Sequence, residues 1–540
     1  DFDIQKILYL DATFVALKAV MIVLKWYRIQ DLPIHWSYRI KRDEIALVTD
    51  YNINDVLGTD ALVKNQQKEL DLRAKLSEMY AIDLRNMSRS SIGKNLMTKF
   101  YSEWSGMPSY EFVDLRTERS AVPIGKIVKD SITFKTPFYR KILEAIQRYS
   151  IYIGLGTAKQ SELKRENIAN GIVVTTWKKS FQSLEFLSHD KGYTLAKGGL
   201  HSKDDPRVIW ANPGEALADP DVASMYPSFI VNYGVSPHHL SSKVFLGIVE
   251  WLRTTRLDAK HNGRKLEADA LKIVINRIYG ALNDAMDYLY DPECTYTVTI
   301  NLQLLLCNLI ESFELNSFDV LSANTDGLLI RRPNDRLDLF NHICKEWEDY
   351  SKLSLDTEVF EKYCRSAVND YIAVGYGFYD ALQEYNRCGV WIDSKGNTYT
   401  TRQAIEDKFI KFKGYFLQDP EYNKGFIYPV VKKALKEYFL YGVDITEFIK
   451  NYINTSRTAI YDYCFSQKVA GKYTTIYKTV RDGKPVYIKC QKHNRFYICK
   501  SGGGAITKAI VPDSDNIAYG DDISGIVVEE EKSLVAGQRV

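Results

Sequence analysis

Residues 322–327 read Ser-Ala-Asn-Thr-Asp-Gly and lie between two apolar runs. Asp-Gly between strand-like runs is a strong hairpin signal, so we predict two strands over residues 320–330 that are joined at this turn. Asp326 would then lie at the tip of the hairpin. Taken alone, such an aspartate is most often a turn or cap residue, so its interpretation depends on the rest of the chain.

A second aspartate, Asp221, begins the segment Asp-Val-Ala-Ser-Met-Tyr-Pro-Ser at residues 221–228. This segment ends a predicted strand at a corner that contains proline. Two carboxylates on adjacent strands, each beside a tight turn, can face each other and hold two Mg²⁺ ions for phosphoryl transfer. We therefore predict that Asp221 and Asp326 are catalytic metal ligands.

Two predicted helices separate these aspartates. Hydrophobic spacing indicates helices over residues 241–262 and 264–280, joined by His-Asn-Gly. Lys272, Asn276 and Tyr279 lie at i, i+4 and i+7, on one face of the second helix. A lysine and an amide on one face can meet a phosphate and a sugar, and a tyrosine at the helix end can meet a base. Ordinary helix decoration is the alternative for each residue taken singly.

The first helix of the hairpin carries two further basic residues, Arg256 and Lys260, at i, i+4. Because the helices run antiparallel, these residues and Lys272 can form a cationic clamp for a triphosphate. Solvated surface charge is the alternative interpretation. The hairpin arrangement favours the clamp.

The composition is that of an ordinary globular protein of 540 residues, with 45% hydrophobic and 26% charged residues, so we expect two to four domains. A net charge of +3 is too small to argue for nucleic acid by itself. Eight scattered cysteines without a Cys-x-x-Cys pair indicate free thiols. No segment reads as a signal peptide or a membrane span, so we expect no membrane partner. The chain begins with Asp1 rather than Met, so we expect a fragment, a processed product or an incomplete open reading frame.

Helices and strands are both expected along the chain, which predicts an α+β protein. Residues 1–100 read as mostly helical, and residues 295–313 read as a further long helix. Residues 171–177 and 360–374 are strand-like. From about residue 425 we expect two helices followed by a β-rich tail.

In this order, the segments around Asp221, Lys272 and Asp326 resemble the polymerase motifs of family B DNA polymerases. Gly-Gly-Leu-His-Ser and Ala-Asn-Thr-Asp-Gly are most similar to bacteriophage members. The resemblance implies a multidomain right-hand polymerase with an antiparallel-sheet palm, short helical-hairpin fingers, a thumb and a partial 3′–5′ exonuclease domain. The implied boundaries are the exonuclease remnant (1–105), a connecting region and start of the palm (106–210), the palm (211–240 and 281–415), the fingers (241–280), and the thumb with the C-terminal region (416–540).

The resemblance also implies roles for the residues of the three motifs. Asp221, Asp326 and the backbone carbonyl of Val222 would bind two Mg²⁺ ions, with Mn²⁺ as a substitute. The resemblance also implies which residues bind the incoming nucleotide. The backbone amides of Ser224 and Met225 would receive the triphosphate, and Tyr226 would lie under the sugar and exclude a 2′-hydroxyl. The hairpin residues complete the set: Arg256, Lys260, Lys272, Asn276 and Tyr279. Asn324 stands where the family usually has an aspartate, a change that affects metal occupancy or fidelity in this interpretation.

A second set of residues would contact DNA. Gly198 and Gly199 resemble the glycine motif that tracks the template. Tyr371 matches a primer-binding segment whose usual lysine is absent here. Lys411 and Lys413 match a basic turn before the thumb.

Tyr51 and Asp55 resemble the third exonuclease motif, Tyr-x-x-x-Asp, with Asp55 as its metal ligand. The residues before them carry neither of the other two exonuclease motifs. We therefore expect that this chain alone does not proofread. Whether the site is completed upstream or by a separate chain stays open.

The expected function is that of a nucleotidyltransferase: template-directed DNA synthesis from a primer 3′-hydroxyl and dNTPs. The resemblance places it in phage genome replication, in the cytoplasm of an infected bacterial host. One alternative is a catalytically impaired, DNA-binding polymerase-like subunit, which Asn324 favours. Another is a nuclease that uses Asp55 and a partner chain. The sequence leaves open whether priming uses nucleic acid or protein.

Overall fold

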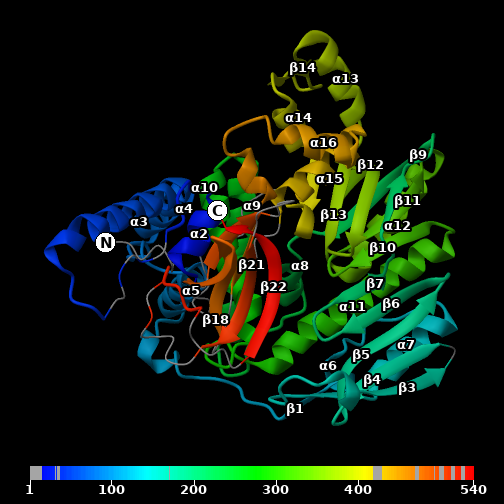
Figure 1. The fold of residues 1–540 in the computed structure, drawn as a ribbon. Coiled ribbons are helices and arrows are strands. Elements are labelled where there is room, and N and C mark those ends of the chain that lie inside the picture. Colours follow the sequence, from blue (N-terminus) through cyan, green and yellow to red (C-terminus); the bar gives the residue numbers. More distant parts are fainter. Residues whose placement is uncertain are drawn as a thin grey trace. The chain divides into compact units, whose positions relative to one another are not determined.

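The computed structural model describes residues 15–539, with gaps at residues 31, 33, 35–36, 170, 418–427, 469–472, 492, 498–503, 512–516, 518 and 525–529. The chain forms two compact units. One unit combines Asp1–Arg89 with Gln418–Val540, and the other is Ser90–Leu417. Figure 1 shows the ribbon with its helices and strands labelled. The division after Arg89 places residues 90–105, expected at the end of the exonuclease remnant, in the second unit.

A 14-stranded sheet organises the Ser90–Leu417 unit. Its strands pair antiparallel except for one parallel pair, β2 with β5. The main path runs β1-β2-β5-β6-β7-β10-β11-β9-β12-β13-β16, while β3 and β4 extend from β5, and β8 pairs with β12. The strands are β1 Ala121–Pro123, β2 Ser150–Tyr152, β3 Lys164–Ala169, β4 Ile172–Trp177, β5 Ser180–Ser188, β6 Lys191–Ala196, β7 Leu200–Lys203, β8 Arg207–Trp210, β9 Glu215–Val222, β10 Asp319–Asn324, β11 Gly327–Pro333, β12 Leu355–Ala367, β13 Asp370–Gly375 and β16 Ile410–Lys413.

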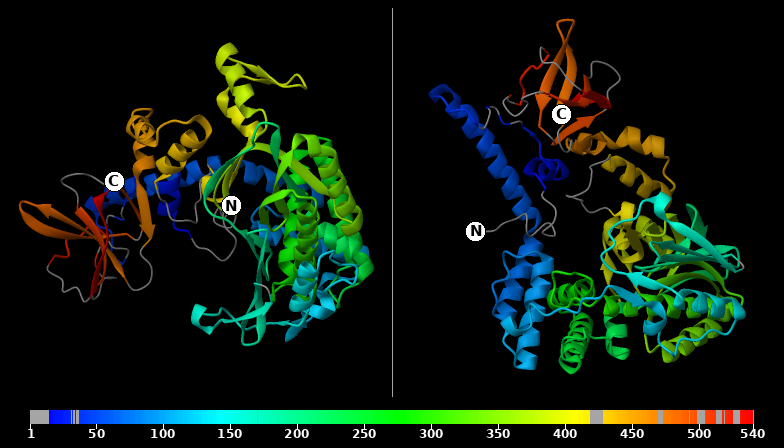
Figure 2. Two further views of the ribbon diagram at one scale, coloured as in Figure 1. Left: turned by 90° about the vertical axis from the view of Figure 1, so that its right-hand side faces the viewer. Right: turned by 90° about the horizontal axis from the view of Figure 1, so that it is seen from below.

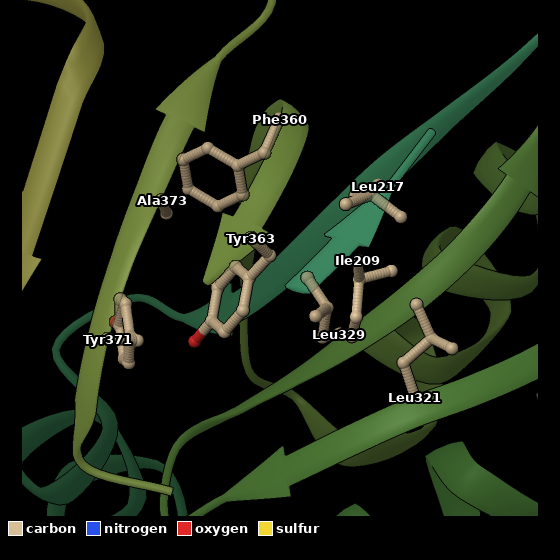
Figure 3. Close-up of a cluster of buried hydrophobic side chains, with 8 residues drawn as sticks. All are labelled: Ile209, Leu217, Leu321, Leu329, Phe360, Tyr363, Tyr371 and Ala373. Atoms are coloured by element: carbon tan, nitrogen blue, oxygen red, sulfur yellow. The ribbon is translucent and has the colours of Figure 1, made fainter. Parts of the chain in front are cut away.

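The centre of this sheet brings together strands that are far apart in sequence. The predicted hairpin forms as β10 and β11, and β11 pairs with β9 so that Gly327 lies opposite Asp221. On its other side, β9 pairs with β12. Figure 3 shows the apolar cluster on these strands, formed by Ile209, Leu217, Leu321, Leu329, Phe360, Tyr363, Tyr371 and Ala373.

Helix α11 (Pro292–Leu315) forms the core behind these strands. Asp291 caps its start and Pro292 occupies the first turn, as expected for a helix N-terminus. The helix is long and apolar enough to cross a membrane, but 78% of its most apolar window is buried inside the protein. Its buried side-chain amides have acceptors, for example Asn301 Nδ2 donating to Ile127 O at 2.8 Å. These features are those of a core helix. Its neighbours include α6 Ile124–Ile127, α7 Pro137–Gln147 and α12 Leu337–Ser351.

The predicted helical hairpin forms as α9 (Ser242–His261) and α10 (Lys265–Leu282), which agree with the expected ranges to within three residues. The link contains Gly263 with φ +70°, a conformation that glycine adopts at little cost. Helix α5 (Arg89–Ser105) packs against this hairpin, with Trp251 touching two of its aromatic rings. The short helix α8 (Met225–Asn232) follows β9 directly. A small insertion between β13 and β16 consists of α13 Phe378–Cys388, β14 Trp391–Ile392, β15 Thr398–Tyr399 and α14 Arg402–Phe409.

The other unit joins the two ends of the chain. Lys25 Nζ pairs with Asp462 Oδ1 at 2.7 Å, and the guanidinium of Arg495 stacks 3.8 Å from the ring centre of Tyr461. Figure 2 gives two further views of these elements. Its six-stranded sheet has the order β17-β20-β22-β21-β18-β19. The elements are α2 Leu17–Val23, α3 Ile45–Asn65, α4 Gln67–Tyr80, α15 Pro429–Tyr441, α16 Ile445–Tyr452, β17 Phe465–Lys468, β18 Thr474–Arg481, β19 Lys484–Cys490, β20 His493–Tyr497, β21 Gly504–Ile510 and β22 Glu530–Arg539.

Candidate active site

The hairpin between β10 and β11 places Asp326 at its tip. Asn324 pairs with Gly327, so the two loop residues are Thr325 and Asp326, and Thr325 adopts φ +47°. Val222 N donates to Asp326 O at 2.7 Å, which ties the tip to the end of β9. The hairpin signal was therefore correct, but Gly327 lies in the strand rather than in the turn.

Asp221 lies on β9 beside this tip, and its Oδ1 is buried without a hydrogen-bond partner among the described residues. Burial, and then the neighbouring Asp326, raise the pKa of Asp221 to about 6, against the opposing charges of Lys411 and Lys413. A buried carboxylate oxygen that lacks a donor and lies beside a second carboxylate requires an explanation. A divalent cation supplies one, because Mg²⁺ prefers oxygen ligands of this kind.

A third carboxylate, Asp219, shares the face of β9 with Asp221, because residues two apart in a strand point to the same side. Lys411 Nζ lies 3.8 Å from Asp219 Oδ2 and 2.7 Å from Glu358 Oε2. Burial raises the pKa of Asp219 to about 7, with Lys411 opposing the shift and Asp221 adding to it. Sequence reasoning missed Asp219. The alternation Asp-Pro-Asp at residues 219–221 was the signal that could have found it.

These carboxylates lie in one polar cleft that also receives aromatic and basic side chains. The rings of Tyr363 and Tyr371 stack with centroids 4.7 Å apart, and Lys413 Nζ lies 5.7 Å from the ring centre of Tyr371. Three of the predicted DNA-binding residues are thus gathered around the predicted metal ligands. The cleft is lined by Asp219, Asp221, Ser322, Asn324, Asp326, Gly327, Leu328, Leu329, Tyr363, Tyr371, Lys411 and Lys413.

Asn324 stands where the family pattern has an aspartate. Its side-chain amide forms one hydrogen bond within the hairpin tip and one to a neighbouring turn. Its Nδ2 donates to Asn369 Oδ1 at 3.0 Å, and its Oδ1 accepts from Thr325 Oγ1 at 3.3 Å. The amide therefore links the tip to the β12–β13 turn, and the carboxylates of Asp221 and Asp326 remain in the cleft.

Helix α8 begins immediately after the end of β9. Ser224, with φ +49°, precedes its first residue, Met225. The N–H groups of these two residues have no acceptor within the helix, as helix geometry requires, and the helix dipole favours an anion at this end. Arg256 Nη1 donates to Ser224 Oγ at 3.3 Å, while Arg256 Nε is buried without a partner among the described residues. The guanidinium of Arg256 therefore lies at the end of α8 where backbone N–H groups have no acceptor within the helix.

The remaining residues of the predicted clamp lie on the two helices of the hairpin. Lys260, Lys272 and Asn276 are exposed. The two lysines form no ion pair within the described part of the chain. Among the described residues, the contact between a predicted cation and the start of α8 is made by Arg256.

Tyr226 on α8 and Tyr279 on α10 stack face to face, with ring centroids 4.0 Å apart and planes 5° from parallel. Burial raises the pKa of both hydroxyls, with Asp326 adding to the shift of Tyr226 and Tyr226 adding to that of Tyr279. Two residues that the sequence assigned separately to a sugar and to a base therefore form one aromatic unit.

Gly198 and Gly199 lie in the tight turn between β6 and β7, where Ala196 N donates to Gly199 O at 3.1 Å. A Cβ at Gly199 would lie 3.3 Å from Thr325, whereas one at Gly198 would meet nothing within 4 Å. The turn is therefore packed against the tip of the β10–β11 hairpin.

In the other unit, the predicted exonuclease residues lie on α3. Lys18 Nζ hydrogen-bonds Asp55 Oδ1 and lies 4.6 Å from the ring centre of Tyr51. The carboxylate of Asp55 is thus neutralised by a lysine.

A second group with metal-ligating side chains, His238, Asp291 and Cys294, lies away from the cleft. Arg119 Nε donates to Asp291 Oδ1 at 3.1 Å, and its Nη2 lies 3.1 Å from His238 Nδ1. Burial raises the pKa of Cys294, which disfavours the thiolate that a metal requires. The guanidinium of Arg119 therefore supplies the positive charge that a metal ion would bring to this group.

Comparisons with known proteins found one partial sequence match and a remote structural alignment. No protein-family model matches the chain. An alignment of 190 residues is 26% identical to a DNA polymerase of Thermococcus gorgonarius and covers 29% of this chain and 24% of that protein. A family B DNA polymerase of the hyperthermophilic archaeon Pyrobaculum calidifontis aligns at 13% identity with a TM-score of 0.36, over 80% of this chain and 47% of that structure. The chain thus spans about a quarter of the curated relative and less than half of the solved structure. The partial alignment with a DNA polymerase agrees with the polymerase motifs, and the bacteriophage assignment stays a prediction.

Proposed function

We propose that this protein is a template-directed DNA polymerase that extends a primer 3′-hydroxyl with dNTPs. The observation that carries this proposal is the pairing of β9 with β11, which brings Asp221 and Asp326 into one cleft, where Asp221 Oδ1 is buried without a donor from the described part of the chain. The similarity to a DNA polymerase over 190 residues supports the same class of function.

Asp221, Asp326 and the carbonyl of Val222 would hold two Mg²⁺ ions, for which Mn²⁺ can substitute. The unpartnered Oδ1 of Asp221 and the crowding of two carboxylates fit divalent cations. When bound, such ions stabilise the charge on the attacking and leaving oxygens of a phosphoryl transfer. Lys411 holds Glu358 and Asp219 on the same face of the sheet.

The nucleotide triphosphate would meet the N-terminus of α8 and the guanidinium of Arg256. Backbone N–H groups at a helix start are a ready anion site, and Arg256 already contacts Ser224 there. The exposed Lys260 and Lys272 would add charge from the hairpin, and Asn276 lies on the same helix face as Lys272. The Tyr226–Tyr279 stack would form the surface on which the sugar rests, so that a 2′-hydroxyl meets the Tyr226 ring.

Primer and template would lie along Tyr371, Lys411, Lys413 and the Gly198–Gly199 turn. The amino-acid sequences of the motifs, which are most similar to those of bacteriophage members, support a role in phage genome replication in the cytoplasm of a bacterial host. Asp55, paired with Lys18, supports the further proposal that proofreading requires residues outside this chain. Removal of mismatched 3′ nucleotides by the purified chain in Mg²⁺ would contradict it.

Primer extension with Mg²⁺ tests the polymerase assignment. We expect Asp221→Ala and Asp326→Ala to lower extension by several orders of magnitude while the affinity for primer–template, measured by fluorescence anisotropy, changes little. Glu384→Ala, which removes an exposed carboxylate from α13 in the same unit, is the matched control. Extension retained by both aspartate variants would refute the metal-ligand assignment.

The same assay distinguishes a polymerase from the main alternative, a DNA-binding subunit without catalytic activity. A DNA-binding subunit without catalysis would bind primer–template with the wild-type chain and extend nothing in either Mg²⁺ or Mn²⁺. A nuclease would instead shorten single-stranded DNA, and its activity would not depend on dNTPs.

A further inference from the structure

Thr325, the residue before Asp326, has an unusual backbone conformation. Its φ of +47° lies in the left-handed region, which β-branched residues rarely adopt. A conformation of this kind persists only where the surroundings impose it, and it occurs most often at functional sites. The contacts that surround Thr325 therefore decide how the catalytic turn is built.

Three consecutive residues of the β6–β7 turn and β7 supply these contacts. Thr325 N donates to Leu200 O at 2.8 Å, and Thr325 Oγ1 lies 3.1 Å from His201 Nε2 within hydrogen-bond distance. Gly199 contributes by lacking a side chain, since its Cβ would lie 3.3 Å from both Cγ2 and Oγ1 of Thr325. Three neighbouring residues therefore surround Thr325. Leu200 accepts from its backbone N–H, His201 lies beside its hydroxyl, and Gly199 leaves room for its side chain.

The pairing of β7 with β10 fixes the register of these contacts. His201 lies opposite Asn324, one residue before Thr325. On the other side of the turn, Val222 N donates to Asp326 O at 2.7 Å. The tip of the hairpin is therefore fastened to β7 before Asp326 and to β9 at Asp326 itself.

We propose that Gly199, Leu200 and His201 form a clamp that holds Thr325 in its left-handed conformation and thereby positions the Asp326 carboxylate beside Asp221. This inference rests on the proposed function, and it gives the glycine turn a task that differs from contact with the template. His201 and Gly199 are positioning residues in this arrangement, because they act on Asp326 through Thr325 and not on the substrate.

The clamp and the template-tracking role predict different results for two adjacent substitutions. Neither glycine has a positive φ, so alanine fits the backbone at both positions. Gly199→Ala places a methyl group against Thr325, whereas Gly198→Ala adds the same group where nothing lies within 4 Å and reports the effect of the turn on DNA alone. If the turn acts by touching DNA, both variants weaken primer–template binding together.

The clamp predicts that Gly199→Ala keeps the wild-type affinity for primer–template but loses at least tenfold in kcat for extension and needs several times more Mg²⁺ for half-maximal rate. A readout without catalysis is Mn²⁺ binding to the DNA-free chain, measured by electron paramagnetic resonance, which should weaken about as strongly. Gly198→Ala should not share the change in Mn²⁺ affinity. Equal Mn²⁺ affinities for wild type and Gly199→Ala would overturn the proposal.

Rescue provides a second, independent test. Thr325→Ser removes the Cγ2 methyl that the new Cβ meets and keeps the hydroxyl for His201, so the double variant Gly199→Ala/Thr325→Ser should recover most of the lost Mn²⁺ affinity relative to Thr325→Ser alone. His201→Gln, which can still hydrogen-bond the hydroxyl, should bind Mn²⁺ more tightly than His201→Ala. Absence of both recoveries would also overturn the clamp.

These outcomes separate the clamp from the function on which it rests. A wild-type chain that extends no primer refutes the polymerase proposal, while the Mn²⁺ titrations still test the clamp. A wild-type chain that extends primers with no difference between Gly199→Ala and Gly198→Ala refutes the clamp alone. Thermal melting of each variant shows whether it is folded, and His201→Gln and the double variant serve where Gly199→Ala is not.

Discussion

Gly327 on β11 lies directly opposite Asp221 on β9, and a Cβ at Gly327 would lie 3.0 Å from Asp221 Oδ1. The same Cβ would approach Pro220 O to 3.2 Å. The missing side chain therefore lets the β10–β11 hairpin lie against β9, and this close approach places the carboxylates of Asp221 and Asp326 in one cleft.

Gly327→Ala should therefore impair catalysis more than folding. The added methyl must displace the Asp221 carboxylate or the strand, so we expect primer extension to fall by ten- to a hundredfold. Overpacking of this size costs on the order of 1–3 kcal/mol of stability. Steady-state extension and urea unfolding measure the two effects. Gly280→Ala, on the exposed face of α10 with nothing within 4 Å of its Cβ, is the stability control and should not destabilise the protein. Wild-type extension by Gly327→Ala would show that the close approach is not needed.

Asp219→Asn should stabilise the protein at high pH. Burial raises the pKa of Asp219 to about 7 in the folded chain, so its contribution to stability is fully present below about pH 4 and is lost as the pH rises through 7. Asparagine does not ionise, so the variant does not lose this stability as the pH rises. We expect the free energy of unfolding of the variant, relative to wild type, to increase by about 1–4 kcal/mol between pH 4 and pH 8. Urea titrations in EDTA measure this difference, and the exposed Glu384→Gln is the control. A difference that does not change with pH would contradict the prediction.

Lys411→Met should shift the pH dependence of primer extension. Lys411 neutralises Glu358 and Asp219, and it opposes the rise in the pKa of Asp221. Without this cation Asp219 and Asp221 hold protons to higher pH, so the acidic limb of the rate profile should move upward by about one pH unit. Lys411→Arg retains the charge and should move the limb much less. A rate profile for Lys411→Met that lies on the wild-type curve would remove Lys411 from this role.

Tyr226→Ala should admit ribonucleotides. The Tyr226 ring is held in place by its stack on Tyr279 at 4.0 Å, so removal of the ring opens the space that a 2′-hydroxyl would need. We expect the ratio of kcat/KM for dNTP over rNTP to fall by at least tenfold. Tyr279→Phe preserves the stacked ring and should retain sugar selection more fully than Tyr279→Ala. Unchanged selection in Tyr226→Ala would assign the discrimination to other residues.

Sequence patterns determined the local elements of this protein. The 3.6-residue spacing over residues 241–280 predicted α9 and α10 closely, because both helices bury one apolar stripe whose period is visible in the sequence. The Asp-Gly signal predicted the β10–β11 hairpin, because a two-residue turn depends on neighbouring residues. Asp221 and Asp326 could be paired by motif alone.

Only the tertiary structure decided which distant residues meet. It placed Lys411 between Asp219 and Glu358, and it placed Lys18 on Asp55. It also assigned Gly327 to a close approach between strands and Gly199 to the packing of Thr325. The relations within the large sheet depend on strand order and register between segments that are far apart in the sequence, and no local pattern encodes such pairing. The chemistry of the cleft follows from the order of the strands, which only the packing of the whole sheet determines.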